Sequence, residues 1–178
     1  MPMLTAGETR VRVLSGKGIG APALKRDQRR RVTLLMPEGC EADAAAFLEG
    51  WREAERLPFP EPLTETVMTS AMPVDRFAAA LGISPPTLYW DERKGLWGWL
   101  NHDKGVIGLN RTLLRLPPCC AEAVLAHECC HLLYKDHSPA FWALLRELMP
   151  GWAWREGLMR GLYQRIRRQN GHAALLEL

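Results

Sequence analysis

The segment from Pro117 to about Tyr134 most restricts what this chain can fold into. Pro117-Pro118 marks the start of a helix, and the residues that follow are mostly apolar, which predicts a buried helix. His127 and His131 lie one turn apart on one face of such a helix, because each residue advances by about 100°. Glu128 lies beside them. The segment therefore predicts a buried helix that presents two imidazoles and a carboxylate at one place.

A third histidine follows where this helix should end. His137 comes just before Ser138-Pro139, which fits the N-cap and first residue of another helix, so the chain can turn and bring His137 back to the first two. Three of the five histidines therefore fall within eleven positions. For each one alone, a surface or core role would be the better interpretation, but the triple favours a metal site.

The spacing His127-Glu128-x-x-His131 is the HExxH arrangement of zinc hydrolases. Zinc takes neutral imidazole nitrogens at roughly 2.0–2.1 Å and keeps a water at its open position. The neighbouring carboxylate takes the proton from that water as it attacks a carbonyl carbon. We therefore predict Zn²⁺ as the cofactor, His127, His131 and His137 as its ligands, and Glu128 as the general base.

The two remaining histidines and Tyr134 are not predicted to bind the metal. His102 lies in an expected turn and His172 in a glycine-flanked tail, so both are predicted to be exposed. Tyr134 would face the metal if the helix persists that far, and its phenol could then stabilise an oxyanion. A plain packing role is the alternative for Tyr134.

Hydrophobic periodicity and turn residues divide the remainder into short elements. Expected strands, which would form a hairpin or two neighbours and then an antiparallel meander, cover residues 11–14, 31–36, 87–90, 96–100 and 106–110. Expected helices cover residues 41–57, 73–81, 139 to about 150, and 152–168. The proline-rich residues 58–62 are interpreted as a linker inside one domain, because neither side is long enough to bury its own core.

Composition fits one ordinary globular domain of 178 residues. No apolar run approaches the roughly 18 residues that span a bilayer, and no leader pattern precedes the first strand, so we expect a cytoplasmic protein without membrane contact. The five cysteines lack the spacing of a disulfide framework and are expected to be reduced, mostly as small buried side chains. Net charge is +3, with basic clusters at residues 25–31 and 165–168 that form either solvated faces or a phosphate-binding patch.

The chain resembles the YgjP-like metallopeptidase domain, which is related to the SprT-like and WLM proteases among the zincins. The resemblance is carried by Trp97-Gly98, Ile107-Gly-Leu-Asn110-x-x-Leu113, Pro117-Pro118, the HExxH residues, His137-Ser138-x-x-Phe141-Trp142 and Met149-Pro150. It implies an α+β, zincin-like fold in which a twisted, mainly antiparallel sheet packs against the HExxH helix, with further helices towards the C-terminus. It also implies one metallopeptidase domain over residues 1–178, with N-terminal strands and a helix in 11–57 and a catalytic core in about 87–168.

The resemblance implies peptide-bond hydrolysis, with a peptide or protein as the substrate. An edge strand, either 96–100 or 106–110, would pair with extended substrate. The chain departs from the family pattern at Trp99-Leu100 and at Tyr134, positions where substrate might pass, which concerns specificity rather than the metal site.

Three alternatives stay open. The enzyme could be a DNA-associated SprT- or WLM-type protease recruited through its basic clusters, or it could hydrolyse non-peptide amide or ester bonds. A purely structural zinc is the third, although three histidines with an adjacent glutamate leave a coordination position open, which structural sites do not.

Overall fold

The computed structural model describes residues 3–6 and 9–170, and contacts between residues divide the chain into two compact units. The first unit contains the residues up to Leu57, residues 137–142 and those from Ala153 onward. The second contains Pro58–Asp136 and Ala143–Trp152. The first division therefore falls at the start of the proline-rich segment. That residues 1–178 act as one domain stays a prediction.

The first unit contains a four-stranded sheet. Its strands are β1 (Met3–Ala6), β2 (Thr9–Gly16), β3 (Ala23–Arg26) and β4 (Val32–Pro37), in the order β1-β2-β4-β3. β2 and β4 pair in parallel, and the two outer pairs are antiparallel. The predicted runs 11–14 and 31–36 are thus neighbouring strands and not a hairpin. The edge strands β1 and β3 were not predicted, because each is four residues long and too short to show an alternating pattern.

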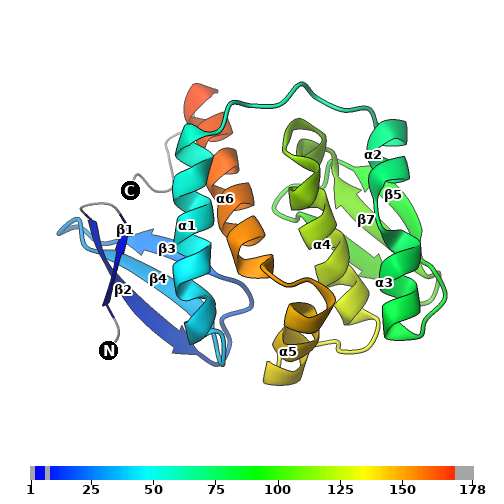
Figure 1. The fold of residues 1–178 in the computed structure, drawn as a ribbon, viewed down its shortest axis with the longest axis horizontal. Helices are drawn as coiled ribbons and strands as arrows, with labels where there is room; N and C mark the ends of the chain where they lie inside the picture. The colour runs from blue at the N-terminus through cyan, green and yellow to red at the C-terminus, as the bar shows by residue number, and fades with distance from the viewer. Residues whose placement is uncertain (1–2, 7–8, 171–178) are drawn as a thin grey trace. The chain divides into compact units, whose positions relative to one another are not determined.

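Two helices of the first unit, α1 (Ala44–Arg56) and α6 (Trp152–Gln169), run side by side (Figure 1). A short 3₁₀ turn, η1 (Glu41–Asp43), precedes α1. The two backbones are in close contact, because a methyl group at Gly50 would lie 1.9 Å from the Trp154 carbonyl oxygen. A methyl group at Gly157 would lie 2.0 Å from the Phe47 carbonyl oxygen. Glycine is therefore required at this helix contact.

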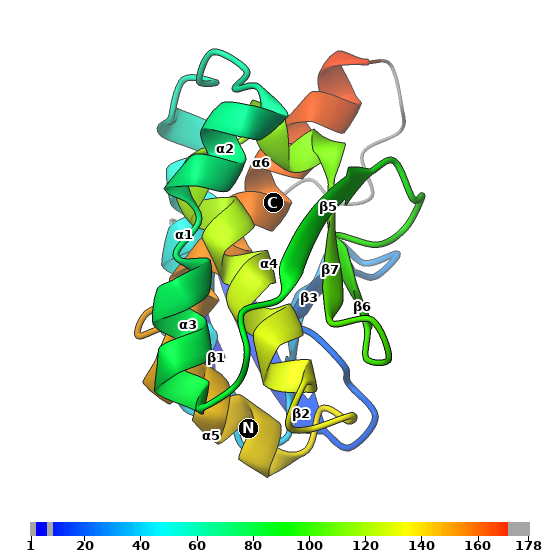
Figure 2. The same ribbon diagram turned by 90° about the vertical axis from the view of Figure 1, so that its right-hand side faces the viewer.

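The second sheet belongs to the second unit and has three strands. They are β5 (Thr87–Asp91), β6 (Gly98–Asn101) and β7 (Val106–Asn110), and β7 lies in the middle (Figure 2). β6 pairs with β7 antiparallel, but β5 pairs with β7 in parallel. The predicted antiparallel meander is therefore wrong in its strand order and in one pairing direction.

The Asn110 side chain binds the segment between β5 and β6. Its Nδ2 donates to the carbonyl oxygens of Arg93 at 2.8 Å and Leu96 at 2.9 Å. These two bonds attach the segment between β5 and β6 to the last residue of β7. β6 then pairs with the edge of β7 opposite to β5. The most apolar strand occupies the centre, since Ile107 and Leu109 are fully buried.

The motif helix α4 (Pro118–His131) packs on β6, β7, α3 (Val74–Leu81) and the 3₁₀ turn η2 (Arg111–Arg115). It ends at His131, three residues before the predicted end near Tyr134, and the amides of Leu133 and Tyr134 both donate to the Cys130 carbonyl in the turn that follows. The other helices are α2 (Glu65–Ala71), which was not predicted, and α5 (Pro139–Leu148). Among the residues with described positions, no helix combines the length and apolar character needed to cross a membrane. The predicted α+β class is confirmed.

Candidate metal centre

The two motif histidines face each other at the end of α4. Their ring centroids are 4.9 Å apart, with ring planes at 76°. The Nε2 atoms of His127 and His131 are 3.2 Å apart. Two nitrogens bound to one tetrahedral zinc at roughly 2.0–2.1 Å would be separated by about 3.3 Å. The separation of the two imidazole nitrogens is therefore compatible with both of them binding one metal ion.

A backbone carbonyl orients the second of these rings. His131 Nδ1 lies 2.9 Å from the carbonyl oxygen of Tyr134, so this nitrogen carries the proton and donates. Nε2 of His131 then keeps its lone pair for a metal ion. The predicted contribution of Tyr134 was its phenol, but its backbone carbonyl is the group that contacts His131, because the turn after α4 brings this carbonyl back to the ring.

His137 is exposed, but neighbouring aromatic side chains hold it. The Trp142 ring stacks on the His137 ring at 5.6 Å and 24°, and Phe141 contacts it edge-on at 4.9 Å. Trp142 Nε1 also donates to the His137 carbonyl oxygen at 3.1 Å. Because Phe141 and Trp142 are buried, they fix the start of the segment that carries His137.

His127, His131 and His137 form a group that could hold a metal ion, and their role as ligands stays a prediction. Each offers one ring nitrogen, and these nitrogens all lie within 4.8 Å of one another. Asp136 and Glu147, the nearest acidic alternatives in the sequence, are exposed and do not belong to this group. A neutral three-nitrogen donor set of this kind suits zinc and leaves a coordination position open.

Glu128 is a buried carboxylate on α4, with a relative exposure of 8%. Among the residues that the structure describes, none donates a hydrogen bond to it. Burial raises the pKa of Glu128 to about 7. A carboxylate whose pKa lies near neutral pH is well matched to accept and return a proton during catalysis.

The remaining polar candidates do not join the group. Burial raises the pKa of the Cys129 and Cys130 thiols to about 12, so both stay protonated and serve as small core side chains, and none of the five cysteines forms a disulfide. His102 is exposed, as predicted. His172 lies outside the described residues.

Trp99 lies on the sheet face opposite Glu128. Side chains alternate along a strand, and its neighbour Gly98 faces α4. The Trp99 ring lies against Gly108, donates from Nε1 to Asp91 at 2.7 Å, and has the Arg93 guanidinium 4.2 Å above it. Trp99 therefore links β6 to β5 and β7 of the same sheet. It does not line the sheet face that packs against α4 and Glu128.

Comparison with known proteins places the chain in a family. No curated protein matches it. The crystal structure of the metallopeptidase zymogen of Pyrococcus abyssi abylysin is distantly similar, with 22% identity and a TM-score of 0.42 over 56% of this chain and 92% of that one. The model of the YgjP-like metallopeptidase domain matches residues 9–160, a range that includes all three histidines and Glu128. The chain therefore belongs to the YgjP-like metallopeptidase family and is a metal-dependent hydrolase.

Proposed function

We propose that the protein is a zinc peptidase in which His127, His131 and His137 hold one zinc ion and Glu128 is the general base. The observation that carries this proposal is the convergence of three imidazole nitrogens within 4.8 Å. The 3.2 Å separation of the two motif nitrogens supports zinc in particular. Glu128 follows directly after the first ligand, so its carboxylate lies next to the group without belonging to it.

When bound, zinc supplies a Lewis acid that lowers the pKa of a water molecule to near 7. Glu128 would accept the proton of a water molecule as that water attacks the peptide carbonyl carbon. The same carboxyl group then returns the proton to the leaving amine. A buried carboxylate suits both steps, because its raised pKa lets it hold the proton between them.

We further propose that extended substrate pairs with β6. The other candidate strand, 106–110, is the central strand β7 and has neighbours on both sides, so it is not available. The Asn110 amide donates to the Trp97 carbonyl, which makes Gly98 and Leu109 a non-hydrogen-bonded pair. The amide and carbonyl groups of Gly98 and Leu100 consequently point away from β7. They point towards the edge of β6 on which no strand of the described residues pairs.

Hydrolysis of an unfolded protein tests this function. We expect the zinc-loaded enzyme to cut unfolded polypeptide, to lose activity with a chelator, and to regain it when zinc is restored. Products are measured by mass spectrometry. Cleavage of simple amides or esters without any cleavage of polypeptide would instead favour the non-peptide alternative.

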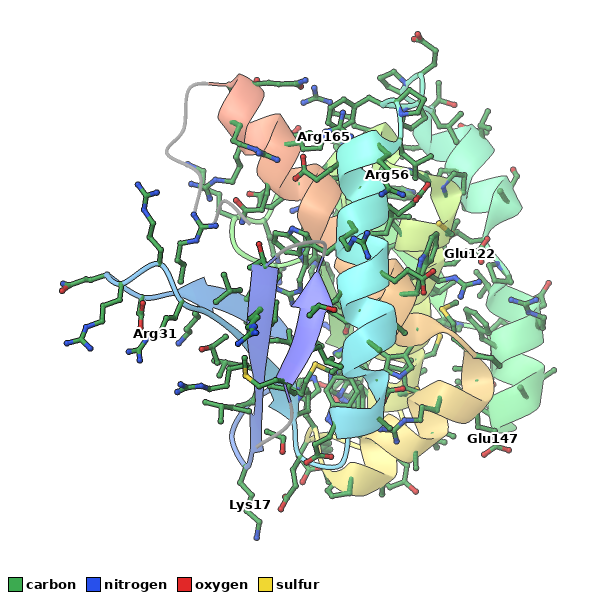
Figure 3. The ribbon with its side chains drawn as sticks, turned by 60° about the vertical axis from the view of Figure 1, so that its left-hand side comes forward. Lys17, Arg31, Arg56, Glu122, Glu147 and Arg165 are labelled. Carbon is green, nitrogen blue, oxygen red and sulfur yellow. The ribbon has the colours of Figure 1, made fainter. Side chains whose placement is uncertain are left out.

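One observation favours DNA association as a second candidate. The loop between β3 and β4 carries exposed Arg29, Arg30 and Arg31 and projects from the sheet (Figure 3). Arg31 of this loop pairs with Asp27. In the cluster at 165–168, Arg165 donates to the Ala54 and Leu57 carbonyls and Arg168 pairs with Glu55. Duplex binding that weakens steeply with salt, and turnover that rises with DNA, would support this candidate.

A further inference from the structure

Gly98 lies directly against the proposed general base. It is the first residue of β6, and its α-carbon faces α4. A methyl group at this position would lie 2.9 Å from both Cγ and Oε1 of Glu128, and 2.7 Å from Cγ1 of Val124. Non-bonded carbon atoms prefer separations of about 3.5–4.0 Å. Any side chain at position 98 must therefore displace Glu128, Val124 or the strand.

The backbone does not explain this glycine. Gly98 is not among the glycines with positive φ, so its conformation is open to other residues. Glycine is needed here because of what lies beside it. The turn glycine Gly105 shows the opposite case, because its φ is 59° and a methyl group there would meet nothing within 4 Å.

The space at Gly98 determines where the carboxylate of Glu128 can lie. Glu128 is buried and no described residue donates a hydrogen bond to its carboxylate, so its packing neighbours restrict its side-chain rotamer. On the side that faces β6, the neighbour of Glu128 Cγ and Oε1 is the backbone of Gly98, which carries no side chain. A displaced carboxylate would no longer face the water that it must deprotonate.

We propose that Gly98 is a positioning residue for catalysis, because its missing side chain leaves the space in which the Glu128 carboxylate lies. This inference rests on the proposed function of Glu128 as the general base. The glycine of the Trp97-Gly98 dipeptide, which is part of the resemblance to the family, thereby gains a role in catalysis.

Four variants test the proposal, namely Gly98→Ala, Val124→Ala, the double variant Gly98→Ala/Val124→Ala, and Gly16→Ala. Val124→Ala removes the Cγ1 atom that a methyl group at position 98 would meet, and it leaves the Glu128 atoms that the same methyl group would meet. Gly16→Ala is the matched control, because a methyl group there meets nothing closer than Ile19 at 3.9 Å. For each variant, kcat, KM and bound zinc are measured, and crystal structures locate the Glu128 carboxylate.

We expect Gly98→Ala and the double variant to keep their zinc and to lose kcat by about 10- to 100-fold, since a misplacement near 1 Å can cost about 10² in rate. KM should change little, and the crystal structures should show a displaced Glu128 carboxylate. The two single controls should turn over at close to the wild-type rate. Recovery of wild-type kcat in the double variant would trace the loss to Val124 packing and overturn the proposal. An unmoved Glu128 in the Gly98→Ala structure would also overturn it.

These outcomes are distinct from failure of the proposed function. That failure appears in the wild-type enzyme, as absent zinc-dependent cleavage of polypeptide. The position of Glu128 in the variant crystals is measured independently of turnover, so it shows in either case whether Gly98 sets where the carboxylate lies.

Discussion

Glu128→Gln is expected to fold and to bind zinc like the wild type, while its kcat falls by about 10²–10⁴, the usual contribution of a general base. Glutamine nearly preserves the size and hydrogen-bonding reach of glutamate but cannot accept a proton. Burial favours the neutral side chain as well, since Glu128 is only 8% exposed. The measurement is steady-state turnover of an unfolded polypeptide, alongside zinc content and thermal unfolding.

Glu122→Gln is the matched control, because Glu122 lies on the same helix, α4, and does not belong to the group of candidate ligands. Its turnover should remain close to that of the wild type. If Glu128→Gln hydrolysed substrate at the wild-type rate, Glu128 would not be the base. If it lost its zinc, Glu128 would take part in coordination, and the mechanism would have to be abandoned.

His137→Ala is expected to weaken zinc binding by more than about 100-fold, because removing even a group that only supports a ligand costs about 10- to 100-fold in affinity. The fold should survive, since His137 is exposed and its buried neighbours Phe141 and Trp142 remain in place. Affinity is measured by competition with a zinc chelator of known strength, and folding by circular dichroism.

The acidic residues nearest in sequence serve as controls for the third ligand. Asp136→Ala and Glu147→Ala should bind zinc nearly as tightly as the wild type, because neither carboxylate lies with the three imidazoles. Release of zinc by Glu147→Ala but not by His137→Ala would indicate a site of two histidines and one carboxylate. The assignment of His137 would then be wrong.

The helix at the centre of the site could be predicted from local sequence alone. Helical periodicity fixes which residues share a face, so His127 and His131 could be paired before their position in space was known. The start of the next helix at Pro139 was also predictable, and it limits the loop that carries His137 to a few residues.

The strand order could not be predicted in this way. Neighbouring strands in sequence usually pair, yet β7 separates β5 from β6, and Asn110 binds carbonyls of the segment between them. Such a side-chain contact spans 14 and 17 residues and leaves no periodic signal. The same limit applies to Gly98, whose contact with Glu128 depends on how β6 packs on α4.

Metal analysis of the purified protein tests the central claim most directly. The account predicts about one zinc per chain, removed by chelation and by falling pH as the imidazoles take up protons, and restored by added zinc. Zinc is quantified by mass spectrometry against protein concentration. A folded protein that stays metal-free after zinc is supplied would contradict the account, because the three imidazoles would then have some other purpose.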